Sequence, residues 1–144
     1  EIKSLGGPDP ARHELLEAAL EVLAGARFPG PVLVSSFNGL TLQRCRELAP
    51  ELPTGFLAAA AIEPMSALTY AQQAGHQVLL PQAESLLEAG PGFVEKSHAS
   101  KLRVGTWTVD DEPTLEKLFL WGVDAVASND PGLAVTVRDR VVAG

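Results

Sequence analysis

The second half of the chain contains the stretch Arg103-Val104-Gly105-Thr106-Trp107-Thr108-Val109. Its β-branched and aromatic residues predict a strand. The apolar spacing of Pro113 to Trp121 then predicts a helix that ends at Gly122, and Asp124 to Ala127 predicts another strand. A strand, a helix and a strand in this order are typical of parallel strands joined by a crossover helix.

The same alternation extends towards both ends of the chain. The starts of the predicted strands are separated by about 20 to 26 residues, the length of one βα unit of an eight-stranded barrel. The further predicted strands are 32–34, 54–59 and 77–80, and the further predicted helices are 15–23, 40–49, 65–74, 93–102 and one that begins at Pro131. We expect Asp9, Thr41 and Asp130 to cap three of these helices.

The fold class has two alternatives at this point. If Glu1 to Lys3 is the end of a strand, the chain holds six strands, and a complete barrel of roughly 200 to 250 residues would then lack its first two βα units. An open doubly wound sheet of five or six strands fits 144 residues without any loss. In either case the length predicts a single domain over residues 1–144.

The composition restricts the partners and the location of the protein. The net charge is −7 and the basic residues form no cluster, so we expect no nucleic-acid partner. Apolar residues make up 46% of the chain, as in a globular protein, and the longest apolar stretch, 56–62, is too short to span a membrane. The single cysteine, Cys45, lies in an apolar-periodic run, which predicts a buried thiol and favours a reducing, cytoplasmic location.

Five short strings occur in the order and spacing of the glycerophosphodiester phosphodiesterase family, which the chain resembles over its whole length. They are Glu1-Ile2-Lys3, Ser36-Phe37, Trp107-Thr108-Val109, Gly122-Val123-Asp124 and the loop that ends at Pro131. The resemblance implies a TIM barrel of the (β/α)8 type, present here as an incomplete barrel of about six βα units that lacks the first two. It therefore favours the barrel over the open sheet.

The resemblance also implies an activity. Members of this family use a divalent metal, here Mg²⁺ or Ca²⁺, and two histidines to hydrolyse glycerophosphodiesters to glycerol 3-phosphate and an alcohol. These histidines belong to a His-Arg-Gly string and a His-Asp string, and neither string occurs in this chain. We therefore expect a phosphoric diester hydrolase of lipid and glycerol metabolism in a longer parent protein. This chain would contain no catalytic residue and would be inactive alone.

Four residues are implied as site residues. Glu1 and Lys3 are two positions apart, so on a strand their side chains share a face. By resemblance, the Glu1 carboxylate is a metal ligand and the Lys3 ammonium holds a phosphate oxygen. Phe37 and Trp107 would line the pocket for a small-molecule glycerophosphodiester. A structural alternative stays open for each: a solvated terminus for the first two, and core packing for the aromatic pair.

The other polar candidates are interpreted as structural residues. His13 is expected on the surface of a helix, His76 in a turn and His98 in a helix. The acidic run 110–112 is interpreted as a solvated loop that caps the following helix, with a second metal site as a minor alternative. Asp110 stands where the family often has Asn.

Two rival functions stay open. The missing histidine strings favour a non-catalytic, degenerate barrel that binds or scaffolds, and the strand–helix alternation alone also fits an unrelated open-sheet α/β hydrolase. Six of eight βα units would leave two unpaired sheet edges. We therefore expect the isolated chain to form a homo-oligomer through these edges or to be poorly soluble.

Overall fold

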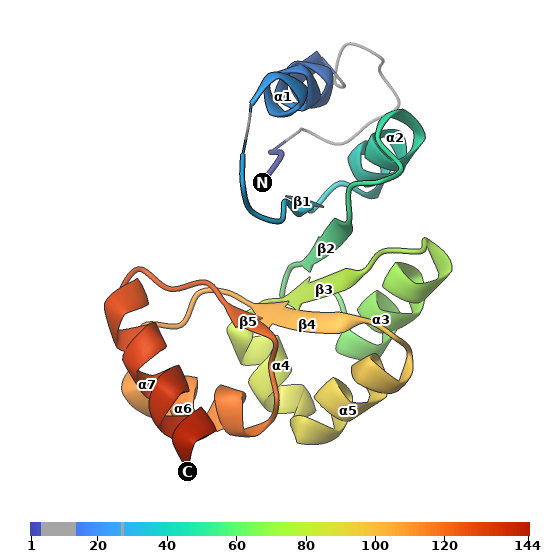
Figure 1. The fold of residues 1–144 in the computed structure, drawn as a ribbon. Coiled ribbons are helices and arrows are strands. Elements are labelled where there is room, and N and C mark those ends of the chain that lie inside the picture. The colour runs from blue at the N-terminus through green and yellow to red at the C-terminus, as the bar shows by residue number, and fades with distance from the viewer. Residues whose placement is uncertain (4–13, 27) are drawn as a thin grey trace. The chain divides into compact units, whose positions relative to one another are not determined.

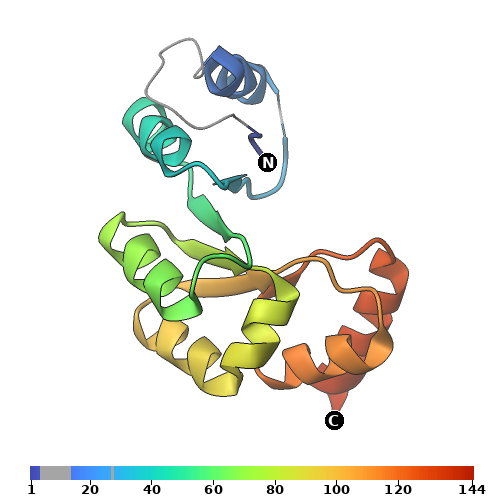
Figure 2. The same ribbon diagram turned by 180° about the vertical axis from the view of Figure 1, so that it is seen from behind.

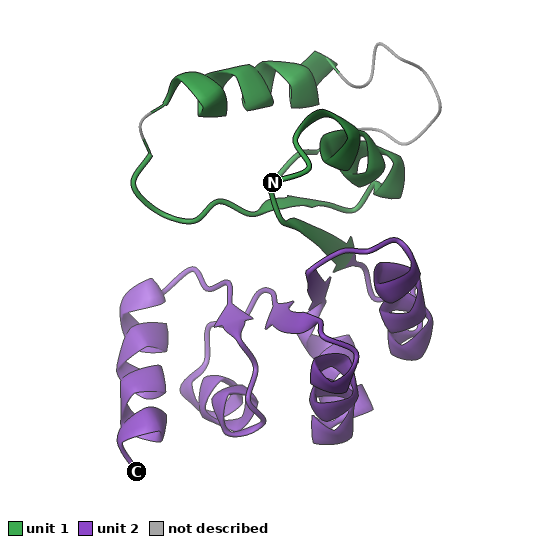
Figure 3. Cartoon of the chain, turned by 45° about the vertical axis from the view of Figure 1, so that its right-hand side comes forward, with its two compact units in different colours: residues 1–57 green, residues 58–144 purple. Residues whose placement is uncertain are grey.

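The computed structural model describes residues 1–3, 14–26 and 28–144 (Figure 1). The contacts of the chain group it into two compact units, residues 1–57 and residues 58–144 (Figure 3). Each unit is built from parallel strands, and each strand is followed by one or two helices.

The first unit contains two helices and two strands. In chain order they are α1 (Glu14–Gly25), β1 (Val34–Ser36), α2 (Gly39–Leu48) and β2 (Thr54–Ala58), whose last residue belongs to the second unit. β1 and β2 pair in parallel, with Val34 opposite Thr54 and Ser36 opposite Phe56. The predicted strands and helices of this region are therefore present, and their bounds differ by a few residues from the sequence prediction.

Apolar residues from both helices form the core of the first unit. Leu16 of α1 and Leu42 and Cys45 of α2 are fully buried. The predicted buried thiol is confirmed, and burial raises the pKa of Cys45. On the surface, Arg44 of α2 forms an ion pair of 3.1 Å with Glu17 of α1, which links the two helices.

The start of α2 differs from the prediction. Asn38 is the N-cap, and its side-chain oxygen accepts a hydrogen bond of 3.0 Å from the Leu40 N–H. Thr41, the predicted cap, lies inside the helix and is 1% exposed. The Asn side chain is short enough to reach the second N–H of the helix, which needs a partner, whereas the Thr41 methyl group favours burial.

The second unit contains three strands and five helices. In chain order they are α3 (Pro64–Gln73), β3 (Val78–Pro81), α4 (Ala83–Ala89), α5 (Pro91–Ala99), β4 (Arg103–Thr106), α6 (Glu112–Leu120), β5 (Ala125–Val126) and α7 (Pro131–Ala143). The strands follow one another in chain order and pair in parallel, with Leu79 opposite Val104 and Gly105 opposite Ala125. All five helices lie on the same side of the strands (Figure 1, Figure 2).

This one-sided arrangement separates a barrel from a doubly wound sheet. A doubly wound sheet has helices on both faces and a reversal of strand order, and the described part of this unit has neither. Leu79 and Val104 are fully buried, while Leu80 is half-buried and Ala125 is exposed. The difference arises because helices cover only one face of these strands.

Several predicted helix ends are confirmed. Asp130 caps α7 by accepting a hydrogen bond from the Leu133 N–H, and Asp111 caps α6 by accepting one from the Thr114 N–H. Gly122 follows α6 with a φ of 82°, a conformation that glycine adopts without strain. The short helix α4 was not predicted, because its seven residues are too few to show a clear helical period.

The chain start does not form the predicted sixth strand. No strand is assigned to Glu1–Lys3, so the described residues contain five strands. The segment nevertheless lies beside β1, because the Ile2 N–H donates to the Ser35 carbonyl at 2.8 Å and the Ser36 hydroxyl donates to the Ile2 carbonyl at 2.7 Å. The predicted cap Asp9 lies outside the described residues.

None of the helices in residues 14–26 and 28–144 combines the length and the apolar character that a membrane crossing requires.

Two leucines of α6 that differ in burial provide a test of this fold. Leu115 is fully buried and Leu120, in the same helix, is 69% exposed. We expect Leu115→Ala to lower the free energy of unfolding by about 2 to 5 kcal/mol, because it leaves a cavity. Leu120→Ala should change it by less than about 0.5 kcal/mol. Urea denaturation followed by circular dichroism measures both, and equal effects would contradict the packing described here.

Candidate active site

Trp107 lies at the carboxyl end of β4, where sites form in parallel β/α proteins. Its indole Nε1 donates a hydrogen bond of 2.9 Å to the Leu80 carbonyl, and its own carbonyl accepts one of 2.8 Å from the Ala83 N–H. A bridge between Trp107 and Gln82 continues the register of β3 and β4. Trp107 therefore has the same position in the pleat as Gly105, on the face without helices, and it is partly exposed.

Thr106 and Thr108 have different surroundings. Thr106 is buried, and its hydroxyl donates to the Pro81 carbonyl at 2.9 Å, whereas Thr108 is exposed. The bridge at Trp107 continues the pairing of β4 by one residue, and Thr108 lies beyond it. The peptide bond between Trp107 and Thr108 is cis.

Gln82, which the sequence analysis did not single out, lies at the carboxyl end of β3. Its backbone N–H donates to the Ala58 carbonyl at 3.1 Å, and its side-chain oxygen accepts a hydrogen bond of 3.2 Å from the Ala60 N–H. Gln82 thus fixes the beginning of the loop that follows β2. The available signal was its place two residues after the predicted strand 77–80, where a polar residue marks the carboxyl end.

Asp110 connects the loops that follow β4 and β5. Its carboxylate accepts hydrogen bonds from the Ser128 hydroxyl (3.0 Å), the Asn129 N–H (2.7 Å) and the Asn129 side-chain amide (2.8 Å). These bonds, chiefly those from Asn129, hold the pKa of Asp110 below its usual value. No group of three or more His, Cys, Asp or Glu with the geometry of a metal site occurs among the described residues, so the minor alternative of a metal site here gains no support.

In the first unit, Glu1 and Lys3 lie close to each other. The Lys3 Nζ is 4.0 Å from the Glu1 Oε1, and their side chains are 81% and 36% exposed, respectively. The hydrogen bonds of Ile2 to β1 hold the backbone between them. The two charged groups are thus accessible to solvent and are placed together, as the i, i+2 spacing predicts.

Phe37 directly follows β1 and is 45% exposed. The preceding residue, Ser36, is buried, and its hydroxyl donates to the Ile2 carbonyl and accepts from the Asn38 N–H at 3.1 Å. Ser36 is therefore a structural residue, as expected. Half of the Phe37 side chain is available for contact with a ligand.

The histidines of the described part have structural surroundings. His98 Nε2 lies 2.8 Å from Asp124 Oδ2, and the same oxygen accepts from the Val104 N–H at 2.7 Å, so α5 is linked to β4 and to the start of β5. His76 is buried, and its ring lies 5.9 Å from the Tyr70 ring. His13 lies outside the described residues.

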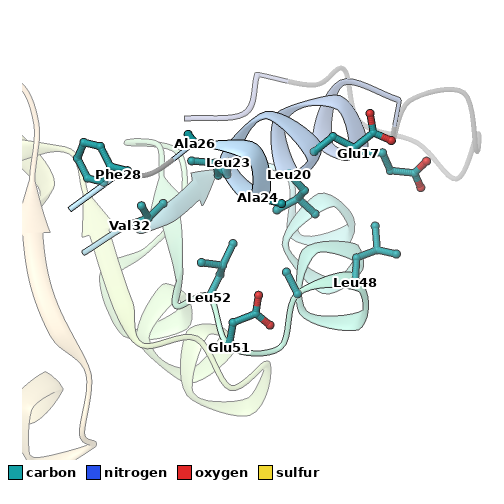
Figure 4. A pocket seen from close by; sticks show the side chains of 12 residues that line it. Glu17, Leu20, Leu23, Ala24, Ala26, Phe28, Val32, Leu48, Glu51 and Leu52 are labelled. Atoms are coloured by element: carbon teal, nitrogen blue, oxygen red, sulfur yellow. The ribbon is translucent and has the colours of Figure 1, made fainter. Parts of the chain in front are cut away.

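The first unit also has an apolar hollow of about 530 Å³, lined by residues of α1, of the end of α2 and of the turn after it, and by Ala26, Phe28 and Val32. Figure 4 shows Leu20, Leu23, Val32 and Leu52 around it, and Glu51 near the rim. None of the predicted site residues lines this hollow. Despite its size, the hollow is therefore not the candidate site.

The parallel strands, the helices on one face and the polar groups at the carboxyl ends define a β/α-barrel protein. A family model described as the glycerophosphoryl diester phosphodiesterase family matches residues 9–133. The chain therefore belongs to this family. The matched range begins after Glu1 and Lys3, so it does not itself include this pair.

Two similar proteins are named as glycerophosphodiester phosphodiesterases. The glycerophosphodiester phosphodiesterase of Bacillus subtilis (strain 168) is 30% identical over 141 residues, which are 90% of this chain and 45% of that protein. The glycerophosphodiester phosphodiesterase of Caldanaerobacter subterraneus subsp. tengcongensis is 28% identical over 120 residues, 80% of this chain and 45% of that protein. The chain thus spans about half the length of these relatives.

Solved structures agree in fold. An Oleispira antarctica phosphodiesterase, in complex with the product sn-glycerol-3-phosphate, has a TM-score of 0.78 and 26% identity, and the match covers 88% of this chain and 50% of that one. A glycerophosphodiester phosphodiesterase from Parabacteroides distasonis has a TM-score of 0.78 at 18% identity, covering 95% and 56%. The predicted fold class, an incomplete TIM-barrel-type α/β fold, is confirmed, and the open-sheet alternative is wrong.

The anchored indole of Trp107 can be tested. We expect Trp107→Phe to lower the free energy of unfolding by about 1 kcal/mol, because the part-buried Leu80 carbonyl loses its donor. Trp121→Phe is the matched control, since that ring contacts Lys117 through its face at 5.1 Å, an interaction that a phenyl ring retains. Chemical denaturation of both variants gives the comparison, and a smaller effect at Trp107 would contradict the anchoring role.

Proposed function

We propose that this chain is the C-terminal part of a barrel domain that hydrolyses glycerophosphodiesters to glycerol 3-phosphate and an alcohol. The observation that carries the proposal is the family match over residues 9–133, together with a partly exposed Trp107 at the carboxyl end of β4. The complex of the Oleispira antarctica phosphodiesterase with sn-glycerol-3-phosphate supports the product class. Both units of the chain would belong to this one domain.

The chain supplies groups that bind the substrate. The Lys3 side chain is largely exposed, so its ammonium group can approach a phosphate oxygen as a point charge. Phe37 and Trp107 offer partly exposed aromatic surface for the glycerol or alcohol part of a small-molecule substrate.

A divalent metal, Mg²⁺ or Ca²⁺, fits the Glu1 carboxylate by its chemistry, because hard cations prefer carboxylate oxygens. No group of three or more His, Cys, Asp or Glu that could hold a metal occurs among the described residues. By the family resemblance, further acidic ligands would come from the part of the barrel that this chain lacks. When bound, the metal withdraws charge from the phosphoryl oxygens. Lys3, 4.0 Å from Glu1, would act on the same charge.

The acid and the base of the reaction would also lie outside this chain. The sequence contains neither the His-Arg-Gly string nor the His-Asp string, and the described histidines have structural partners. This chain alone would therefore bind substrate without turnover.

The absence of the two histidine strings also supports the second candidate, a degenerate barrel that binds or scaffolds. A longer encoded protein with both histidine strings would exclude this candidate. The single cysteine, Cys45, is buried, which is in keeping with a cytoplasmic location.

The charged pair gives the direct test of this function. In the longer protein, Glu1→Ala and Lys3→Ala should each lower kcat/KM for a glycerophosphodiester by about 100-fold or more, because charge stabilisation at the phosphate is lost. The melting temperature should stay unchanged, since both side chains are exposed. Glu95→Ala and Lys96→Ala are matched controls, as they remove the same charges from the exposed surface of α5. If the two pairs had equal effects on kcat/KM, the roles of Glu1 and Lys3 would be wrong.

The association state of the isolated chain is a further proposal. β5 pairs with β4 and has no second partner among the described strands, and such an edge can add another strand. We expect the 144-residue chain to elute from a size-exclusion column as a dimer or larger species, with the equilibrium dependent on concentration. A monomer with a sharp thermal transition at all concentrations would count against association through the edge.

A further inference from the structure

We propose that Asp110 is a positioning residue that joins the loops after β4 and β5 and thereby sets the orientation of Trp107 at the mouth of the substrate site. The three residues Asp110, Ser128 and Asn129 are called the loop clasp below. This inference rests on the proposed function for its kinetic consequence. Its structural basis is independent of that function.

Beyond the ends of β4 and β5, backbone hydrogen bonds still connect the two segments as far as the loop clasp. The Ala127 N–H donates to the Thr106 carbonyl at 2.8 Å, and the Val109 N–H donates to the Ala127 carbonyl at 3.1 Å. Trp107 and Thr108 lie between these two connections. Trp107 is held towards β3 by its hydrogen bonds with Leu80 and Ala83, so the freedom that remains to this short segment depends on how the residues on its C-terminal side are held.

Asp110 fixes that side through three hydrogen bonds to one short segment. One carboxylate oxygen accepts from the Ser128 hydroxyl and the Asn129 N–H, and the other accepts from the Asn129 side-chain amide. All of the donors lie in the loop after β5. A carboxylate that receives bonds on both oxygens has little rotational freedom, so the two loops are held in one relative arrangement.

The loop clasp continues into the helices. The Ser128 hydroxyl oxygen also accepts from the Asp130 N–H at 3.0 Å, and Asp130 caps α7. On the other side, Asp111, the neighbour of Asp110, caps α6. The loops at the mouth are thus tied to the first turns of α6 and α7, two helices that pack against each other.

An exchange of the amide and carboxylate groups between positions 110 and 129 tests this arrangement. Asn129→Asp places a second carboxylate where the amide now lies 2.8 Å from Asp110, and the two like charges repel. Asp110→Asn combined with Asn129→Asp exchanges amide and carboxylate. The amide at position 110 can then donate to the new carboxylate and accept from the backbone N–H of position 129, so the complementarity returns.

We expect Asn129→Asp to raise KM for a glycerophosphodiester in the longer protein by about tenfold, with kcat changed by less than about threefold, because the mouth and not the reacting centre is displaced. The double exchange should restore KM to within about threefold of the parent value. Arg140→Met is the matched control. It breaks an ion pair of 2.7 Å between α7 and Glu112 of α6, so it should lower the melting temperature and leave KM unchanged.

A spectroscopic measurement tests the positioning without catalysis. In a Trp121→Phe background, the fluorescence emission reports on Trp107 alone, since the chain has two tryptophans. Asn129→Asp should shift the emission maximum, the double exchange should restore it, and Arg140→Met should leave it in place. If Asn129→Asp changes neither the emission nor KM, or if the double exchange fails to restore both, Asp110 does not position Trp107. Absence of hydrolysis by the parent protein, with the emission changes present, would overturn the proposed function and leave the loop clasp supported.

Discussion

The structure of the second unit depends on the fact that helices cover only one face of its strands (Figure 1, Figure 2). Parallel strands joined by helices must bury the helix-facing side, and Leu79 and Val104 are accordingly fully buried. The opposite face carries the half-buried Leu80 and the exposed Ala125. In a barrel this face is the interior, so the residues that look insufficiently buried are those whose partners belong to other strands of the barrel.

The register of the parallel strands determines which residues stand at the end of this inner face, at the mouth of the barrel. The offset that pairs Leu79 with Val104 also pairs Gln82 with Trp107, so both side chains stand where β3 and β4 end. Gly105 permits the close approach of the strands' side chains, because a Cβ there would lie 2.6 Å from a methyl carbon of Leu80. The packing of the interior and the position of the candidate site are thus consequences of one register.

Much of this could be predicted from the sequence, and the parts that failed share a physical cause. Periodicity and caps located the strands and most helices, and Asp130 and Gly122 were identified because their roles depend on neighbours in sequence. Gln82 and the partners of Asp110 were missed, because their contacts, with Ala60 and with Asn129, connect positions about twenty residues apart. The prediction at Thr41 was wrong because the backbone conformation at Asn38, three residues earlier, already begins the helix there.

The distribution of chemistry within the chain follows from the same architecture. A β/α barrel draws its site from loops after many strands, so a chain that spans about half the length of its relatives contains only some of the groups. The groups proposed above for this chain are of the kinds that bind an anionic diester. Hydrolysis needs in addition a base for the nucleophile and an acid for the leaving alkoxide. The described histidines are engaged in packing and in the link to Asp124, so we propose that proton transfer depends on residues outside this chain.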